Sequence, residues 1–483
     1  MHCACRTTLA LAALLALAPC PARAQEVPPL KAEPTQAPLP QSRVWALEPS
    51  YLVPALEIPG FILLLNQYDR RAYPTLVEEG KKTYGTTLQS FKDHVFHGPW
   101  GIDQDAFAMN QFNHPYSGTI YHGFARSAGL GFWTSLLYTN AGSLAWETGG
   151  ETTRPSYNDQ IASGVAGSFF GEALFRMAGL VMEGDGIHPP TLWRKLGAAM
   201  LAPSAAINRY AFGDRFRAVF PSGDPALTWR VRLGESLHSD LEQQGVRSTI
   251  ARNQVTADFS LAYGLPGKDG YTYERPFDYF QFDLTTLGSH VNPVDTILIR
   301  GLLLGTKYEL GDSYQGIWGL YGGYDYISPQ IFRVSSTSVS LGTTFQFLPT
   351  EHLAMQGTAM AGVGYAASGN ANQGVDRDYH YGIAPQALAS LRVIIADTLM
   401  FDITGRSYRL SGVGSDDPGG RENINRLNAG LTVRVYHSHG LGIQYVSSSR
   451  AAYYPGRADV HQTVGTVALV YNLMGDMGFG VVR

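Results

Sequence analysis

Cysteine is almost absent from this chain, and its position is more informative than its number. All 3 cysteines, Cys3, Cys5 and Cys20, lie near the start of the 483 residues. If that segment is removed, the remaining protein has no thiol. A cysteine nucleophile, a thiolate zinc or iron–sulfur site and a disulfide framework are then excluded.

Charged residues are also scarce. They make up 16% of the chain, against about a quarter in an average protein. The net charge is −4, so no basic excess favours nucleic acid as a partner. Glycine and tyrosine are abundant instead, with 54 and 27 residues. This composition is typical of a chain rich in strands and turns that has an amphipathic surface to cover.

Residues 1–24 have the three parts of a secretory signal peptide. Arg6 supplies the positive region, Leu9–Ala18 the apolar run, and Ala22-Arg23-Ala24 a small-x-small cleavage site before Gln25. The apolar run is too short to be a membrane helix, which needs about twenty residues. The proline-rich residues 25–45 are predicted to be a linker. We therefore expect a protein exported by a Gram-negative cell.

The hydrophobic period changes once along the chain, and this change divides it into two parts. Residues 46–215 are predicted to be a helical domain, and residues 228–483 alternate between apolar and polar side chains as strands do. In one such segment Phe259, Leu261 and Tyr263 oppose Asp258 and Ser260. About twelve segments of this kind are each long enough to cross a membrane as a tilted strand. The predicted fold is α+β: a helical N-terminal domain followed by an antiparallel outer-membrane β-barrel of about twelve strands.

The same alternation is compatible with a soluble sandwich or barrel that buries its apolar face inside. Two features favour the membrane barrel. The polar faces carry charges of both signs, as the lumen of such a barrel does, and ten tyrosines lie near the segment ends, where the aromatic girdle at the membrane interface is expected. Those tyrosines include Tyr263, Tyr324, Tyr326 and Tyr408. Membrane barrels commonly finish on an aromatic residue, whereas this chain finishes on Arg483, so Tyr471 or Phe479 is expected to carry the assembly signal.

Two long helices are predicted in the helical half, over 119–146 and 157–182. Ser156 followed three residues later by Asp159 has the form of a capping box that starts the second helix. Along that helix Ser163, Gly167 and Gly171 recur every four residues and form a smooth stripe for close helix packing. No lysine follows these glycines, so a phosphate-binding role is not supported.

The polar residues of this half include candidates for chemistry, although the sequence assigns no catalytic residue. Glu172 and Arg176, four residues apart, are interpreted as a buried ion pair, with a charge relay as the alternative. No H-E-x-x-H or similar spacing is present, so neither a metal site nor any other cofactor is predicted, and no serine is in a hydrolase motif. The candidates for catalysis are His114, Glu147, Glu151, Asp159 and Glu172.

Three segments of the helical half resemble a known family. HPYSGTIYHGFARSAG (114–129), WETGGE (146–151) and PSYNDQIASGVAGSFFGEALFR (155–176) are similar to bacterial envelope proteins catalogued only as a domain of unknown function. The resemblance covers about residues 86–210 and implies a helical domain ahead of a strand-rich region, but no reaction. The motif residues that carry it, which we interpret as structural, are Pro115, Tyr116, Gly118, Arg126, Trp146, Ser156, Asn158, Gly167, Gly171 and Arg176.

The sequence favours a non-enzymatic protein. The leading hypothesis is an outer-membrane barrel with a helical periplasmic or plug domain that plugs, caps or docks on the barrel, in a transport, channel or envelope-organising protein. Its expected partners are outer-membrane lipid, the barrel-assembly machinery and a small-molecule or lipid ligand, but no nucleic acid. One alternative is a soluble periplasmic binding protein. Another is a lipid-modifying hydrolase or acyltransferase, for which the barrel half offers His290, His352, His380, His437, His439 and Ser447.

Overall fold

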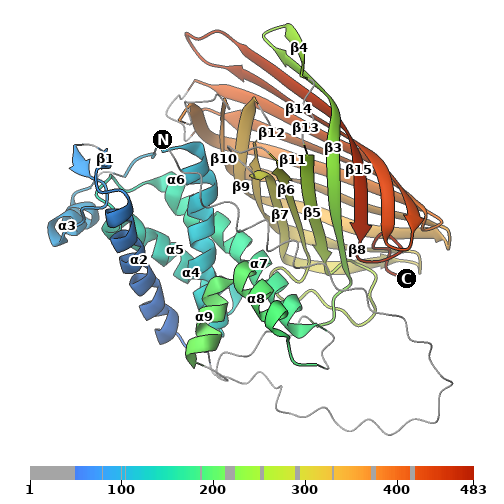
Figure 1. Ribbon diagram of the computed structural model, residues 1–483, viewed down its shortest axis with the longest axis horizontal. Coiled ribbons are helices and arrows are strands. Elements are labelled where there is room, and N and C mark those ends of the chain that lie inside the picture. Colours follow the sequence, from blue (N-terminus) through green and yellow to red (C-terminus); the bar gives the residue numbers. More distant parts are fainter. Residues whose placement is uncertain are drawn as a thin grey trace.

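A computed structural model describes the chain from residue 49 to 483, except for residues 79, 99, 104, 185–187, 213–222, 251–254, 289–293, 329–330, 371–376 and 414–418. The expected signal peptide and linker lie outside the described residues, as does His290. Figure 1 shows two parts side by side, a group of helices and a barrel of strands.

The helical part follows the N-terminal half of the chain. Its α-helices are α2 (Leu52–Ala72), α3 (Leu88–Phe96), α4 (His114–Ser127), α5 (Phe132–Gly149), α6 (Tyr157–Asp159), α7 (Gly167–Glu183), α8 (Leu192–Leu201) and α9 (Pro203–Phe212). Two π-helical turns, η2 (Met109–Asn113) and η3 (Gln160–Ala166), and a small hairpin of β1 (Val77–Glu78) and β2 (Lys81–Lys82) complete it.

The C-terminal half forms a closed antiparallel barrel of twelve strands, which confirms the predicted fold class. Each strand pairs with the next, and β15 pairs with β3 to close the sheet, while the short β4 extends β3 as a hairpin. The strands are β3 (Leu227–Gln243), β4 (Val246–Ile250), β5 (Val255–Tyr263), β6 (Phe280–Leu287), β7 (Val294–Leu310), β8 (Tyr314–Ile327), β9 (Phe332–Thr350), β10 (Leu353–Asn370), β11 (Tyr379–Ile395), β12 (Leu399–Ser411), β13 (Arg421–Tyr436), β14 (His439–Tyr453) and β15 (Val460–Met474).

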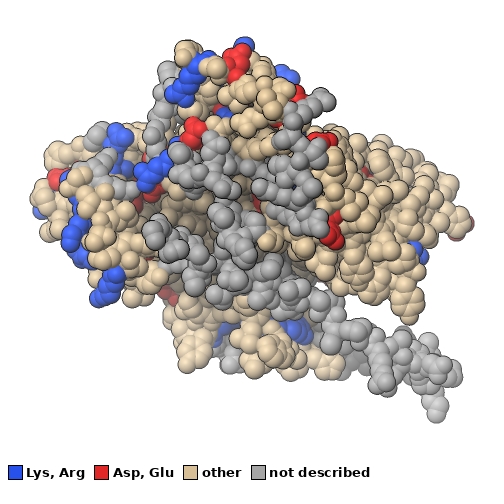
Figure 2. Space-filling model, turned by 45° about the horizontal axis from the view of Figure 1, so that its top comes forward, with Lys and Arg blue, Asp and Glu red and all other residues tan. Residues whose placement is uncertain are grey.

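The two faces of the barrel wall differ in polarity as those of an outer-membrane barrel do. Leu431 on β13, Ile443 on β14 and Leu469 on β15 point outward and are exposed, whereas Arg and Asp side chains line the interior. Charged groups are sparse over the barrel on the right of Figure 2. A closed sheet with an apolar outer face satisfies its backbone polar groups within lipid. The protein is therefore an outer-membrane barrel, and the soluble alternative is wrong.

The connections distinguish the two ends of the barrel. Short turns at 311–313, 351–352, 396–398 and 437–438 lie at one end, together with the longer 264–279 connection, the start of β3 and the end of β15. We call this the turn end. The connections at the opposite end, the loop end, span 288–293, 328–331, 371–378, 412–420 and 454–459. In membrane barrels the short turns face the periplasm and the longer loops face outward.

The helical domain lies against the outer wall of the barrel, so of the three arrangements that the sequence left open it docks on the barrel and does not plug it. Phe169 and Phe170 of α7 share one buried apolar cluster with Phe282 on β6 and Tyr324 on β8. Phe282 and Tyr324 are outward side chains of the wall, and the lumen is lined by other residues. Contacts reach from the 264–279 connection at the turn end to Tyr381 at the loop end. The domain thus extends along the wall and does not lie beneath one end, as a wholly periplasmic domain would.

This docking also corrects part of the tyrosine girdle. Tyr263, Tyr324 and Tyr326 are buried beneath the helices, and Tyr408 lies inside the lumen, where its hydroxyl donates to Asp325 Oδ2. Sequence alternation indicates only that a side chain points outward. It does not indicate whether lipid or protein covers that side chain.

One predicted helix is divided in the structure. The segment 119–146 contains the end of α4 and most of α5, because Gly129 adopts a φ of +91°. The N–H of Leu130 donates to the carbonyl of Ala125, and that of Gly129 donates to the carbonyl of Arg126. This pair of bonds is the Schellman motif that ends many helices. Gly129 therefore ends α4, although the helical periodicity of the sequence continues past it.

The second predicted helix is present as the continuous run α6–η3–α7, and its glycine stripe packs as expected. A Cβ on Gly167 would lie 2.6 Å from Gly118 Cα, and one on Gly171 would lie 2.9 Å from His122 Cβ. Side chains therefore cannot be accommodated where α4 crosses this helix. The run Tyr157–Glu183 is long and apolar enough to cross a membrane, but 67% of its apolar window is buried within the protein, as in a core helix.

Candidate functional site

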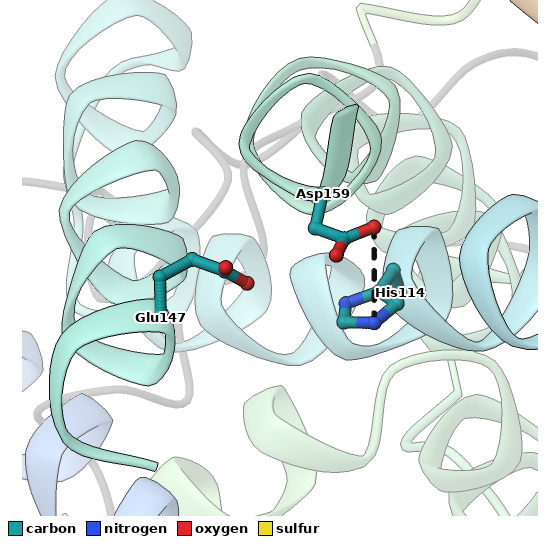
Figure 3. Close-up of side chains that lie close together, drawn as sticks. All are labelled: His114, Glu147 and Asp159. Carbon is teal, nitrogen blue, oxygen red and sulfur yellow. Dashed lines mark ion pairs between the residues drawn. The ribbon is translucent and has the colours of Figure 1, made fainter. Parts of the chain in front are cut away.

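Three of the sequence candidates meet in a buried cluster, although they lie on three helices. His114 begins α4, Glu147 is in the last turn of α5, and Asp159 ends α6. One ligand atom from each lies within 4.8 Å of the other two. Figure 3 shows the Glu147 side chain extending toward Asp159, with the His114 ring beside it. We call these residues the acidic cluster.

The hydrogen bonds of the acidic cluster leave Glu147 Oε1 without a partner among the described residues, whereas Asp159 Oδ1 accepts from Asn158 Nδ2 at 3.0 Å. Ser156 supports both carboxylates: its backbone N–H donates to Glu147 Oε2 at 2.8 Å, and its hydroxyl donates to Asp159 Oδ2 at 2.5 Å. In a full capping box the backbone N–H of Ser156 would donate to the side chain of Asp159. Here it donates to Glu147 instead. His114 Nδ1 is 3.1 Å from the hydroxyl of Ser163, and His114 Nε2 is 4.0 Å from Asp159 Oδ1.

Burial and like charge dominate the electrostatics of this cluster. Burial raises the pKa of Glu147 well above its usual range, and the neighbouring Glu151 and Asp159 carboxylates raise it further. Burial likewise raises the pKa of Asp159, with a further contribution from Asp103. The pKa of Glu151 is raised to about 8, chiefly by burial. The cluster therefore holds excess negative charge that either protons or a cation can neutralise.

Glu172 is separate from the acidic cluster and belongs to a second buried network. Its Oε2 accepts from Arg126 Nε at 2.7 Å and lies 3.1 Å from His122 Nε2, while Oε1 accepts from Arg176 Nε at 2.9 Å. Burial alone raises the pKa of Glu172, but Arg126, His122 and Arg176 together hold it well below its usual range. The predicted ion pair between Glu172 and Arg176 is present, and Arg126 and His122 are further partners of the Glu172 carboxylate.

This second network also attaches the helices to the barrel. Arg176 Nη1 lies 3.0 Å from Asp278 Oδ1, and Arg176 Nη2 donates to the carbonyl of Pro276 at 2.6 Å. Both partners are in the 264–279 connection at the turn end of the barrel. The carboxylate of Glu172 thus fixes the side chain that anchors the domain.

The remaining motif residues support these two networks. Asn158 donates to the hydroxyl of Tyr381 on β11 at 2.9 Å, and Trp146 packs in the cluster beneath α2. Pro115 is in the first turn of α4, Gly118 and Gly167 bring the helices together, and Tyr116 is exposed beside Phe112. The sequence motif is therefore mainly the set of residues that packs α4, α5 and α7.

The barrel lumen contains a second candidate site. A cavity of about 160 Å³ is lined by polar side chains of β3, β5–β7 and β9–β13. Five arginines and two aspartates contribute its charge: Arg230, Arg232, Arg392, Arg406, Arg426, Asp283 and Asp402. Nε of Arg392 and of Arg406 are buried without a hydrogen-bond partner among the described residues.

Apolar clusters lie inside the barrel toward both of its ends. Toward the loop end, a buried cluster inside the barrel includes Ile327, Phe332 and Leu410. Toward the turn end, Phe479 from the C-terminal tail packs against Ile394 and Met400. Of the two aromatic residues expected to carry an assembly signal, only Tyr471 lies on the last strand.

The barrel residues considered for a lipid-modifying enzyme are spread over the ends of different strands. His352 lies in the β9–β10 turn, His437 and His439 lie at the β13–β14 turn, and His380 lies at the loop end of β11. Ser447 is in the middle of β14. Among the described residues, no catalytic arrangement joins this serine to a histidine.

Comparison with known proteins characterises the helical domain. Residues 99–204 match the model of a domain of unknown function, DUF3943. This segment contains both buried networks and all the motif residues, and it ends before the barrel begins. No curated protein matches the chain.

Solved structures with similarity to the chain are barrels. The NanC porin is 11% identical, with a TM-score of 0.23, and the match covers 50% of this chain and 98% of that one. The Pseudomonas putida toluene transporter TodX is 7% identical, with a TM-score of 0.22 and coverages of 53% and 90%. Neisserial surface protein A is 9% identical, with a TM-score of 0.17 and coverages of 51% and 96%. With scores of this size, the fold assignment rests on the strand pairing of the chain itself.

Proposed function

We propose that the protein transports small anionic solutes across the outer membrane through its barrel lumen. The observation that carries this proposal is the charged cavity, which is lined by five arginines and two aspartates, with Arg232 and Arg426 also paired to Asp258 and Asp295 outside its lining. Rings of arginine and lysine favour anions in pores because they lower the electrostatic cost of moving an anion out of water. The Nε atoms of Arg392 and Arg406, which have no hydrogen-bond partner in the part of the chain that the structure describes, give such a solute two donors.

The C-terminal tail after β15 supplies the gate in this proposal. Gln346 donates to the carbonyl of Val482 at 2.6 Å, and the N–H of Val482 donates to Gln346 Oε1 at 2.9 Å. Gln356 donates to the carbonyl of Gly480 at 2.7 Å, and Phe479 fills the space between these contacts and the wall. These hydrogen bonds, the Phe479 side chain, and Arg483, which pairs with Asp397 and donates to the carbonyl of Glu351, hold the tail at the turn end of the lumen. Its release opens the turn end of the cavity.

We infer further that the chain is a member of a Gram-negative envelope family in which a helical domain precedes a barrel. The match of residues 99–204 to a domain of unknown function supports this assignment. Outer-membrane lipid is the proposed partner of the exposed barrel wall, and the assembly machinery is the proposed partner of the last strand, where Tyr471 is outward-facing.

Transport is tested by measuring ion conductance in planar bilayers. Full-length protein is compared with a chain lacking residues 475–483, and we expect the deletion to increase conductance several-fold. The double variant Arg392→Glu with Arg406→Glu is expected to change the selectivity from anions toward cations. Arg409→Glu is the matched control, because Arg409 lies on the same strand as Arg406 but is exposed. A flat trace for both full-length and tail-deleted protein would overturn the proposal.

A further inference from the structure

We propose that His114, Glu147 and Asp159 bind one divalent transition-metal cation, such as Zn²⁺ or Mn²⁺, where the helical domain meets the loop end of the barrel. The geometry in Figure 3 brings one imidazole and two carboxylates from three separate helices to a common point. This inference is independent of transport through the lumen, because none of the three residues lines the cavity.

The arrangement around the three side chains is that of metal ligands held by a second layer of hydrogen bonds. With its proton on Nδ1, His114 donates to Ser163 and directs the lone pair of Nε2 toward Asp159. Ser156 holds the opposite oxygens of both carboxylates. Metal-binding histidines and carboxylates are typically oriented in this way, by a partner on the atom that does not touch the metal.

Glu147 gives independent evidence for a ligand. Its side chain is 1% exposed, and its Oε1 has no hydrogen-bond partner among the described residues. A carboxylate oxygen deprived of both water and a donor costs about 1 to 3 kcal/mol or more. Among the described residues, no arginine or lysine forms an ion pair with Glu147 or Asp159, whereas Glu172 has two such partners. A cation at the centre would neutralise the cluster and coordinate Oε1.

The spacing and the ligand types favour a first-row divalent ion. Oxygen and nitrogen ligands at about 2.1 Å from a metal are about 3 to 4 Å apart, so the observed separations, all within 4.8 Å, need only a small contraction. Imidazole together with carboxylate suits Zn²⁺ or Mn²⁺ better than Ca²⁺, which prefers six to eight oxygens.

Binding at this point would also strengthen the attachment of the helices to the wall. The metal would join α4, α5 and α6, and Asn158, next to Asp159, donates to Tyr381 of β11. Removal of the metal should therefore loosen the loop end of the interface more than the turn end, where Arg176 makes a separate contact with Asp278.

The test uses the full-length protein in detergent, stripped with a chelator and then titrated with Zn²⁺ or Mn²⁺ alone. We expect one ion per chain by elemental mass spectrometry, and a rise in the melting temperature of the helical domain on binding. His114→Ala, Glu147→Gln and Asp159→Asn should each weaken binding at least tenfold. Asp240→Asn is the matched control, since Asp240 pairs with His238 at 3.0 Å on the exposed surface and is not one of the three proposed ligands.

Glu147→Gln keeps the test decisive if other variants misfold. This substitution preserves shape and removes a buried charge, so in chelator the variant should be at least as stable as the wild-type protein while failing to gain stability from the metal. The proposal is overturned if the wild-type protein binds less than stoichiometric metal, or if Glu147→Gln and Asp159→Asn bind it as tightly as the wild type.

Discussion

The barrel wall has two outer faces that follow the same alternation yet meet different surroundings. On the covered face, Phe259 and Phe282 are 7% and 3% exposed, because helices of the same chain pack on them. On the free face, Ile443 and Leu469 are 52% and 51% exposed. The comparison teaches that a membrane barrel can use one part of its apolar exterior as a protein interface and leave another part to lipid.

The two faces also differ in their chemistry. The covered face is rich in aromatic rings, and Phe282 stacks on Phe170 with centroids 6.4 Å apart. Polar contacts lie at both ends of it, from Arg176 with Asp278 to Asn158 with Tyr381. The free face exposes aliphatic side chains that fluid lipid can surround in any orientation. Packing against a rigid partner requires complementary shapes, whereas packing against lipid does not.

The largest effect should come from removing the charge that neutralises Glu172. Arg126→Met leaves this carboxylate buried with part of its partners missing, which typically costs about 3 to 5 kcal/mol. We expect the helical domain to become sensitive to protease while the barrel keeps its heat-modifiable migration on gels. Arg70→Met on the exposed side of α2 is the control. If the variant barrel also lost its heat-modifiable migration, the helical domain and the barrel would unfold as one unit, which would contradict the prediction.

A direct comparison of the two faces uses matched truncations. Phe282→Ala opens a cavity under α7 and should destabilise the docked domain by about 3 to 5 kcal/mol. Ile443→Ala on the free face should cost less than about 1 kcal/mol, because lipid or detergent fills the space. Denaturant unfolding followed by tryptophan fluorescence measures both. If both variants lost the same free energy of unfolding, the covered and free faces would not differ in packing as we describe.

A smaller effect is expected at the loop end of the interface. The hydroxyl of Tyr381 accepts from Gln111 and from Asn158, each at 2.9 Å. Tyr381→Phe leaves these two amides without that acceptor and should cost about 1 to 3 kcal/mol. Hydrogen exchange should increase in η2 and α6 but not at α8, which lies away from Tyr381. Unchanged exchange in η2 would argue against these bonds as an anchor.

The smallest effect concerns the pH dependence of the stability of α2. Burial raises the pKa of Glu57 on α2 to about 7, while a hydrogen bond with Asn208 lowers it. Because the folded form binds the proton more tightly, this stabilisation is complete below about pH 4.5 and is lost as the pH rises through about 7. Glu57→Gln should flatten the decline in α2 stability between pH 5 and 8. Glu235→Gln, an exposed change on β3, should leave the slope as it is in the wild type.

Several features of the fold could be predicted from local patterns. Alternation along Phe259, Leu261 and Tyr263 indicated a strand with an apolar face, and the stripe of Gly167 and Gly171 indicated close helix packing. Gly129 carried a helix-stop signal that was outweighed by the apolar periodicity around it. The acidic cluster could not be predicted, because His114, Glu147 and Asp159 are separated by turns whose geometry decides whether they meet.

The sequence by itself determined which side chains of the C-terminal half share a face, because successive side chains of a strand point to opposite faces of the sheet. It also determined the closeness of α4 and α7, since only glycine permits that approach. Tertiary structure alone decided which outward residues meet helices and which meet lipid. It also decided that one histidine and two carboxylates share a buried point, because these outcomes depend on contacts between segments far apart in the chain.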